Sequence, residues 1–375
     1  MNFRLGSAAL LWAVVVTASA ADVTAIADYS TAPHLPLAVA IDKRDSNTIF
    51  VAQKAGGFLV LRLAGDEFVR VAHLPKRHFQ HQDVTYLKRR ENVVFATLGD
   101  HFAAGGAKAG LARIDVSDPA KPKVTAVWTS KTTLRGSAHV EVDGATAYLG
   151  AMQHGVFVLD LRQSTRIREL TRILPDKDFP LPNPRGPREP ASRGLALKGN
   201  ILFVANDAGG LRAIDIANPR QPREIGRHIN PKMGNKPQAY NKVLIVRDRA
   251  YVAIDYCGFE VVDIRDPRNM RQISWWNPWQ CEQFKNVWFN SPGHTNQMVI
   301  NGREVWLSAG DSELLSLDVS TPRRPQLAWR HGAPRNGRGT WGLNATDERI
   351  YLTYIRTPIP FRGTWAGIIA LDVQR

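Results

Sequence analysis

The sequence has few cysteines, few acidic residues and, beyond its first 20 residues, no long apolar run. Two Cys among 375 residues are too few for a disulfide-dense scaffold or a four-cysteine zinc module. The 34 Asp and Glu are outnumbered by 49 Lys and Arg, which gives a formal net charge of +15. No glycine-rich phosphate loop, nucleophile elbow or nucleic-acid motif occurs. We therefore expect no transmembrane segment and no nucleic-acid partner.

The first segment, residues 1–20, has the pattern of a secretory signal peptide. Its apolar run, residues 8–16, is shorter than the ~20 residues of a bilayer span, and the segment ends on Ala18-Ser19-Ala20. Small residues at these positions are typical of a cleavage site. We expect an exported protein, periplasmic or secreted, in a compartment where Cys257 and Cys281 can pair.

One short pattern recurs through residues 21–375: an apolar residue, Asp, then Val, Ile or Leu, often followed by a Pro turn. Its copies are Ile114-Asp115-Val116, Leu159-Asp160-Leu161, Ile214-Asp215-Ile216, Val262-Asp263-Ile264, Leu317-Asp318-Val319 and Leu371-Asp372-Val373, with a degenerate first copy at Leu61-Arg62-Leu63. Upstream of each copy, an alternating apolar segment, a tight turn and a second apolar segment indicate a hairpin. Each unit therefore predicts four antiparallel strands.

Seven such units predict an all-β fold, a single seven-bladed β-propeller of four-stranded antiparallel blades over residues 21–375. The first strands of the units contain Val39, Val84, Val140, Leu195, Val243, Met298 and Leu343. The chain ends directly after the third strand of the seventh unit, whereas residues 23–29 form a spare strand before the first unit. We expect this N-terminal strand to close the ring as the outer strand of the last blade.

The recurrent unit resembles the LVIVD repeat family of exported bacterial and archaeal β-propellers, and the resemblance covers nearly all of residues 21–375. It implies a propeller on the cell surface or in the envelope, with no established common reaction. The Asp that recurs in six of the seven units is interpreted as a structural turn residue that binds backbone N–H groups.

Residues that are unique to one unit are the candidates for function. In a propeller, the loops from each fourth strand to the next first strand, and from each second to third strand, lie on one face. The long loops here, residues 99–110, 176–192, 230–240, 277–295 and 355–367, all belong to that face. Variable loops on a rigid scaffold are the usual place for a binding site.

First strands begin beside the propeller axis, so side chains at their starts should converge there. The predicted ligand-binding set is His139, Arg193, Asn241, Lys242, Asn296, Gln297 and Trp341. Asp83 is expected at the same mouth, with His81 nearby. A polar channel that only holds water is the alternative interpretation.

The 277–295 insertion is rich in aromatic residues and contains Cys281. Because Cys257 lies in the preceding turn on the same face, we predict a disulfide that pins this loop beside the channel. Trp279 and Trp288 would either stack on a sugar or aromatic ring or help form a small core under the loop. The second interpretation is preferred for most of the aromatic residues.

Charge on this face favours an anionic ligand. The loops carry more basic than acidic residues: Lys177, Arg185, Arg188, Lys232, Lys236, Lys285, Arg335, Arg338, Arg356 and Arg362 against Asp100, Asp176, Asp178, Glu189 and Glu282. A basic rim around a polar mouth attracts anions. A generally basic surface that serves solubility is the alternative.

The leading hypothesis is a monomeric, non-catalytic binding or scaffold protein that recognises an anionic small molecule, a glycan or a cell-envelope protein. The rival is a metal-assisted hydrolase or lyase at the channel mouth, in which His139 and Asp83 serve as ligands or acid and base, and Lys242 or Arg193 stabilises negative charge. No cofactor is predicted, although a divalent metal is compatible with His81, Asp83, His139 and His294. A third possibility is an assembly scaffold that uses the blade rims.

Overall fold

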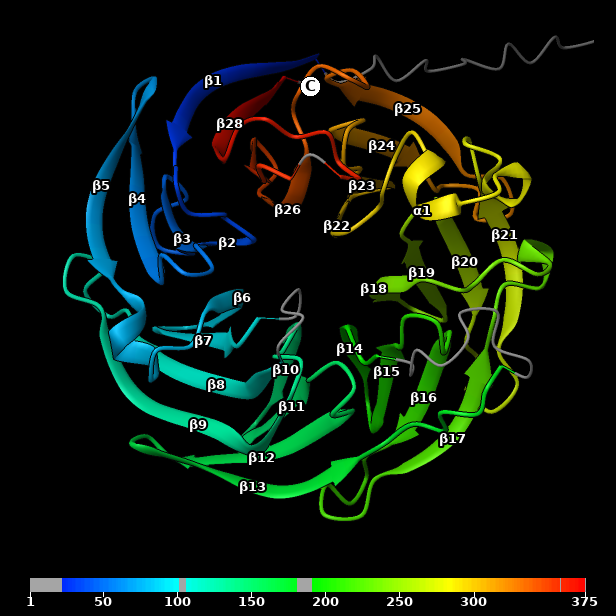
Figure 1. The fold of residues 1–375 in the computed structure, drawn as a ribbon, viewed down its shortest axis with the longest axis horizontal. Coiled ribbons are helices and arrows are strands. Elements are labelled where there is room, and N and C mark those ends of the chain that lie inside the picture. Colours follow the sequence, from blue (N-terminus) through cyan, green and yellow to red (C-terminus); the bar gives the residue numbers. More distant parts are fainter. Residues whose placement is uncertain (1–21, 101–105, 181–190, 358, 375) are drawn as a thin grey trace, which may run out of the picture.

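The computed structural model describes residues 22–100, 106–180, 191–357 and 359–374. Their strands form seven four-stranded antiparallel sheets, arranged around a ring (Figure 1). The protein is thus an all-β, seven-bladed propeller, as the repeats predict. The predicted signal peptide lies outside the described residues, and its cleavage stays a prediction. No helix in the described ranges is long and apolar enough to span a membrane.

The first four blades follow chain order from the axis outward. Blade 1 contains β2 (Ala38–Ile41), β3 (Thr48–Ala52), β4 (Phe58–Ala64) and β5 (Glu67–Leu74); blade 2 contains β6 (Val84–Arg90), β7 (Val93–Leu98), β8 (Ala107–Asp115) and β9 (Lys123–Leu134). Blade 3 contains β10 (His139–Asp143), β11 (Thr146–Gly150), β12 (Val156–Gln163) and β13 (Arg166–Ile173); blade 4 contains β14 (Gly194–Lys198), β15 (Ile201–Ala205), β16 (Leu211–Asp215) and β17 (Arg223–His228).

The last three blades carry most of the long loops. Blade 5 contains β18 (Tyr240–Val246), β19 (Arg249–Ile254), β20 (Phe259–Asp263) and β21 (Arg271–Trp276); blade 6 contains β22 (Met298–Asn301), β23 (Glu304–Ser308), β24 (Leu314–Asp318) and β25 (Gln326–His331). Blade 7 contains β26 (Thr340–Ala345), β27 (Arg349–Tyr354), β28 (Gly367–Gln374) and β1 (Asp22–Ser30). The loops contain short helices: η1 (Lys76–Phe79), η2 (Pro231–Met233), η3 (Cys281–Gln283) and α1 (Val287–Asn290).

The ring closes as predicted, through the first strand of the chain. β1 pairs antiparallel with β28, in a register that runs from Asp22 opposite Gln374 to Ser30 opposite Gly367. Two strands far apart in sequence therefore complete one blade, and no blade is left without its outer strand. This closure removes an unpaired strand edge that would otherwise invite aggregation.

The core consists of apolar layers between neighbouring blades. Strand β3 is buried along its whole length, whereas the outer strand β5 is largely exposed. Tyr351 of blade 7 packs with Val51 and Leu59 of blade 1 in one such layer. Because both faces of each inner strand are covered by adjacent blades, one blade alone could not bury its apolar surface.

Four of the six repeated Asp residues act in turns, as the pattern predicts. Asp115, Asp215 and Asp318 each accept a hydrogen bond from the backbone N–H two residues later, at 2.8 to 2.9 Å. Asp263 makes the same bond and also accepts from the guanidinium of Arg265, so these four side chains fix the turn after a third strand. Asp160 binds Arg162 within β12, and Asp372 binds Arg349 from within β28.

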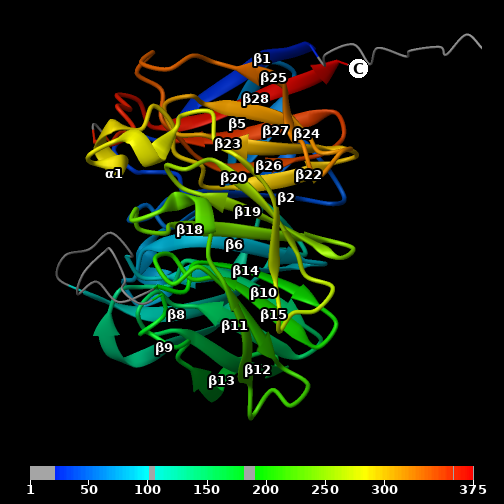
Figure 2. The same cartoon turned by 90° about the vertical axis from the view of Figure 1, so that its right-hand side faces the viewer.

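The long loops gather on one face of the ring. Figure 2 shows α1 on one side of the propeller, away from the short hairpin turns at the opposite side. Arg212 of β16 holds the start of one of these loops. Its guanidinium is fully buried and donates to the backbone oxygens of Asp176 and Phe179 at 2.9 Å. The blades therefore supply a rigid platform for the loops on this face.

Candidate functional site

A narrow pocket lies where the first strands begin beside the axis. Its cavity volume is about 20 Å³, room for about one water molecule. Its lining consists of Leu37, Thr85, Tyr86, Ala138, His139, Arg193, Gly194, Asn241, Asn296, Gln297 and Trp341. Among the described residues, the lining contains the guanidinium of Arg193 and no carboxylate. The pocket is therefore polar and locally basic.

Six of the seven residues predicted to bind a ligand line this pocket: His139, Arg193, Asn241, Asn296, Gln297 and Trp341. The seventh, Lys242, is buried and is not part of the lining. Its side chain lies behind the pocket, against His139. The repeat pattern thus correctly predicted that residues from blades 3 to 7 meet at the axis. The structure places one of them, Lys242, behind the other six.

Asp83 does not reach the axis, contrary to the sequence prediction. Isolated bridges pair Lys54 with Val84 and Asp207 with Tyr240, so Val84 corresponds to Tyr240, and Tyr86 takes the ring position given to Asp83. Asp83 instead lies near Lys54 and Asp100, and burial together with the negative charge of Asp100 raises the pKa of Asp83. The prediction was wrong because blade 2 was aligned three residues too early, on Val84 instead of Leu87.

Behind the pocket, Lys242, His139 and Tyr86 form a buried cluster. The ammonium of Lys242 contacts His139 Nε2, and it lies 3.4 Å from the hydroxyl of Tyr86 and 5.2 Å from the centre of that ring. The rings of Tyr86 and His139 are 4.1 Å apart. No carboxylate contacts Lys242 directly, since the neighbouring Glu141 is paired with Lys88 at 2.8 Å.

Burial controls the protonation of this cluster. It lowers the pKa of Lys242 to about 7, with Glu141 opposing and Lys88 adding to the shift. Burial and the charges of Lys242 and Lys88 hold the pKa of His139 well below its ordinary value, so the imidazole is neutral. A charged Lys242 can only donate, so Nε2 accepts and the ring proton lies on Nδ1, which is buried without a partner.

An amide network forms another side of the pocket. Asn241 Nδ2 donates to the backbone oxygen of Thr295 at 3.0 Å and to Asn296 Oδ1 at 3.3 Å. Asn296 Nδ2 in turn donates to the backbone oxygen of His294 at 3.2 Å. Asn241 Oδ1 is buried and has no partner. The pocket region therefore combines an unpaired acceptor with the cationic group of Arg193.

The aromatic residues divide between packing and exposure. Trp341 packs edge-on against Phe361, with ring centres 5.5 Å apart, in a small cluster with Leu37. Trp279 packs on the backbone at Gly293 and on the ring of Trp276 at 6.2 Å. In contrast, Trp288 of α1 is 38% exposed. The interpretation as a small core holds for Trp279 and not for Trp288. Trp341, predicted to bind a ligand, packs on Phe361 and also lines the pocket.

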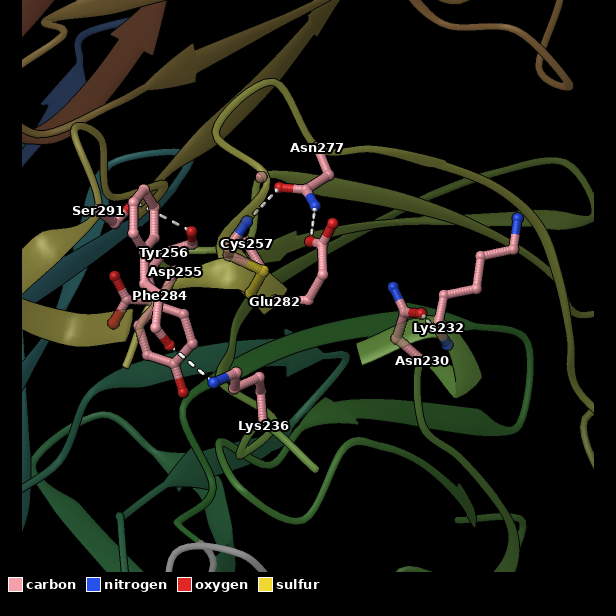
Figure 3. Close-up of a disulfide and its surroundings, with 12 residues drawn as sticks. Asn230, Lys232, Lys236, Asp255, Tyr256, Cys257, Asn277, Glu282, Phe284 and Ser291 are labelled. Atoms are coloured by element: carbon pink, nitrogen blue, oxygen red, sulfur yellow. Dashed lines mark hydrogen bonds between the residues drawn. A yellow bond between two sulfur atoms is a disulfide. The ribbon is translucent and has the colours of Figure 1, made fainter. Parts of the chain in front are cut away.

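The predicted disulfide between Cys257 and Cys281 is present, with 5.3 Å between the Cα atoms. Figure 3 shows it beneath the insertion, where Lys236 donates to the backbone oxygen of Phe284 at 2.7 Å and Asn277 binds Glu282 at 2.6 Å. The bond joins the turn after β19 to the insertion that precedes β22. The disulfide and its neighbours thereby fix the aromatic insertion onto blade 5.

The four predicted metal-binding residues are dispersed. His81 is exposed, Asp83 lies near Lys54, and His139 contacts Lys242. His294 is fully buried and binds Asp255, with 2.6 Å between Nδ1 and Oδ1. Within the described parts of the chain, no group of three or more His, Cys, Asp or Glu side chains is placed to hold a metal ion.

The basic rim is smaller than the sequence suggests. Arg185, Arg188 and Glu189 lie outside the described residues. Lys236 binds a loop carbonyl, and Arg338 stacks on Trp365 at 4.1 Å. Lys177, Lys232, Lys285, Arg335 and Arg356 are exposed on this face, so a positive surface remains around the pocket.

Sequence reasoning missed two buried groups. Tyr86 was missed because blade 2 was aligned three residues too early. Asp311, in the turn between β23 and β24, is 2% exposed, and neither carboxylate oxygen has a hydrogen-bond partner. Burial raises the pKa of Asp311 to about 6, although His294 and Arg362 oppose the shift. Comparison of the turns between units would have singled out Asp311, because no other aligned turn carries an acidic residue there.

Known proteins agree with the fold. Residues 191–229, which span blade 4, match the LVIVD repeat model, so the predicted resemblance is confirmed for this unit. No curated protein matches the chain.

Three solved structures are similar in fold. For the WD40 repeats of RRP9, the TM-score is 0.66 at 10% identity, with 94% of this chain and 100% of that chain covered. The β-propeller domain of Myceliophteria thermophila Cps50 (Swd1) has a TM-score of 0.60 at 10% identity, with the same coverage. The computationally designed Ika8 protein has a TM-score of 0.54 at 13% identity, covering 92% and 98%. At these identities the likeness concerns the fold alone.

Proposed function

We propose that this propeller is an exported binding protein whose axial mouth takes the anionic group of a small molecule bearing hydroxyl groups, such as a hydroxy acid or an acidic sugar. The observation that carries the proposal is the composition of the lining: among the described residues it contains Arg193 and three side-chain amides but no carboxylate. A guanidinium recognises a carboxylate or phosphate through paired hydrogen bonds. Export is supported by the disulfide, which is typical of oxidising compartments.

The unpaired groups near the pocket favour a ligand with hydroxyls as well as charge. His139 Nδ1 and Asn241 Oδ1 are buried without partners, and such groups are costly unless something binds them. The imidazole offers an N–H to an anion, and the amide oxygen accepts from a hydroxyl. Lys242 contributes by holding His139 in this tautomer and by adding positive charge behind the pocket.

Ligand titration tests the proposal directly. Glucuronate, glycolate and inorganic phosphate are added to the purified protein, and binding is followed by melting temperature and calorimetry, with glucose as the uncharged counterpart of glucuronate. We expect an anion with hydroxyls to bind and glucose not to bind. Arg193→Gln should weaken binding by about 10-fold or more, because a charge-assisted pair contributes roughly 1.5–3 kcal/mol.

A matched control is Arg220→Gln, which removes an exposed Arg from the turn after β16, away from the pocket. It should leave binding unchanged. The proposal fails if none of the anions binds the wild-type protein, or if Arg193→Gln binds them as tightly. Capture of an envelope protein or a neutral glycan that survives Arg193→Gln would point to the loop surface instead.

A second candidate is a hydrolase or lyase acting at the same pocket. The observation that favours it is Lys242, because a pKa of about 7 suits acid–base chemistry at neutral pH. Turnover of an ester or acidic glycoside that falls far more in Lys242→Met than anion binding does would support this candidate. Binding without turnover would oppose it.

A further inference from the structure

The loops of blades 5, 6 and 7 bring together a buried imidazole and a buried carboxylate with unsatisfied atoms. His294 is 0% and Asp311 is 2% exposed. His294 Nε2 and both carboxylate oxygens of Asp311 have no hydrogen-bond partner. Neither residue lines the axial pocket, so the proposed ligand site does not account for them.

The two residues lie on adjacent backbone segments. The His294 N–H donates to the backbone oxygen of Ala309 at 3.3 Å. A Cβ atom on Gly310, which precedes Asp311, would lie 3.1 Å from His294 Cβ. On the side of blade 7, Arg362 Nη1 is 3.7 Å from Asp311 Oδ2, which balances part of the carboxylate charge.

Asp255 determines which nitrogen of His294 is free. Its Oδ1 lies 2.6 Å from His294 Nδ1, and an ionised carboxylate can only accept. Nδ1 therefore carries a proton, which leaves Nε2 as the ring nitrogen that can bind a metal ion. The rings of Phe361 and Tyr256, centred 5.1 and 6.5 Å from that of His294, hold the imidazole in this orientation.

Comparison of the blades shows that neither residue is needed to build the propeller. Isolated bridges align the turns after the second strands with the segments that precede the next first strands, pairing Lys54 with Val84, Met152 with Ser192, Asp207 with Tyr240, Asp255 with Thr295 and Gly310 with Thr340. In this alignment the other blades have Ala55, Gln153, Ala208 or Tyr256 in place of Asp311, and Asp83, Ala191, Ala239 or Gly339 in place of His294. Several of these are small and apolar, so a buried imidazole and carboxylate are additions to the scaffold.

We propose that His294 Nε2 and the carboxylate of Asp311 bind a divalent first-row transition-metal cation such as Zn²⁺. A cation would satisfy the unpaired nitrogen of His294 and the unpaired oxygens of Asp311, and imidazole with carboxylate is a ligand set that such metals favour. Asp255 would orient the histidine, as carboxylates do behind metal-bound imidazoles. Since no third acidic, cysteine or histidine side chain of the described residues joins them, water completes the coordination.

The neighbouring disulfide prepares this site. Cys257 follows Asp255 by two residues, and its bond to Cys281 fixes the turn that carries Asp255. A bound cation would then connect the insertion of blade 5 to the turn of blade 6. The metal would add a side-chain link between two segments that already share the backbone hydrogen bond from His294 to Ala309.

Metal titration of tag-free, disulfide-intact protein tests the proposal. After treatment with a chelator and dialysis, Zn²⁺ binding is measured by calorimetry and Co²⁺ binding by visible absorption. We expect one ion per chain. His294→Gln and Asp311→Asn should each lower the affinity by at least about 10-fold, and Asp255→Asn by about 10- to 100-fold.

Two controls separate this site from others. His81→Gln removes an exposed histidine and should bind metal normally, and so should Arg193→Gln, which tests the anion pocket independently. Circular dichroism checks the fold of each variant. If His294→Gln or Asp311→Asn does not fold, the test uses the melting temperature instead. Zn²⁺ should raise the melting temperature of the wild type, and this rise should be smaller in Asp255→Asn.

Two outcomes would overturn the proposal. One is a wild-type protein that binds neither ion stoichiometrically, which would mean that only water lies between the two residues. The other is folded His294→Gln and Asp311→Asn protein with wild-type metal affinity.

Discussion

The ammonium of Lys242 contacts His139 Nε2 near the axis of the propeller. This contact joins blade 5 to blade 3 behind the axial pocket. Neither partner brings a carboxylate, so the pair relies on the neutrality of the imidazole. A buried lysine in this setting favours its uncharged form. The contact therefore has consequences for stability as well as for binding.

The stability of the protein should depend on pH through Lys242. Its pKa is about 7 in the folded protein against an ordinary 10.5, so between these values the unfolded chain binds more protons than the folded one, and stability rises with pH. We expect the wild type to gain stability from pH 7 to pH 9.5, with a slope of at most about 1.4 kcal/mol per pH unit. Lys242→Met should lack this gain, as urea unfolding at several pH values will show.

For Lys242→Met, the difference from the wild type should favour the variant most below pH 7, where the buried charge costs the wild type most. Parallel pH profiles for the two proteins would contradict the assignment. Lys198→Met, which alters an exposed lysine paired with Asp248, serves as the control and should retain the wild-type slope.

Removal of the disulfide should loosen the insertion and lower stability. The bond closes a loop across a sequence separation of 24, for which chain entropy predicts a contribution of about 3 kcal/mol. The double variant Cys257→Ala/Cys281→Ala should lose about that amount in chemical denaturation. Proteolysis should cleave the insertion near α1 first, and an unchanged cleavage pattern would show that packing alone holds the loop.

Tyr240 should contribute more to the free energy of unfolding than an ordinary tyrosine does, because its hydroxyl binds the buried carboxylate of Glu260. Glu260 is fully buried and accepts bonds from Tyr240 at 2.5 Å and Gln272 at 2.8 Å. Tyr240→Phe should cost about 1.5–3 kcal/mol, because a hydrogen bond to a charged group is lost. Tyr256→Phe, whose hydroxyl donates to the backbone oxygen of Pro237 at 2.8 Å, should cost only about 1 kcal/mol. Equal losses in denaturant unfolding would count against this account.

Ring closure should be needed for a soluble monomer. A protein that begins at Thr31 lacks β1 and exposes the edge of β28, which β1 covers along its length. We expect aggregation or a broad unfolding transition in size-exclusion chromatography and calorimetry, because unpaired edges associate. A protein that begins at Ala21 keeps the strand and is the control. A compact, cooperative truncated form would show that three strands suffice in blade 7.

The sequence by itself determined the repeat and its closure. Alternation along strands and the Asp-Pro turns are local properties, repeated often enough to fix the blade count and to mark β1 as the missing strand of blade 7. The same regularity placed His139, Arg193 and Asn296 at the axis, because equivalent positions in a closed ring must converge. The disulfide followed from two cysteines placed on one face.

Only the tertiary structure decided how individual side chains meet. Strand pairing showed that Leu87, not Val84, is the equivalent residue in blade 2, which places Tyr86 instead of Asp83 at the axis. The tertiary structure placed Lys242 behind His139, and it brought His294 beside Asp311 from loops of different blades. Such contacts depend on loop paths and depth of burial, which are set by packing among distant segments and leave no periodic signal in the chain.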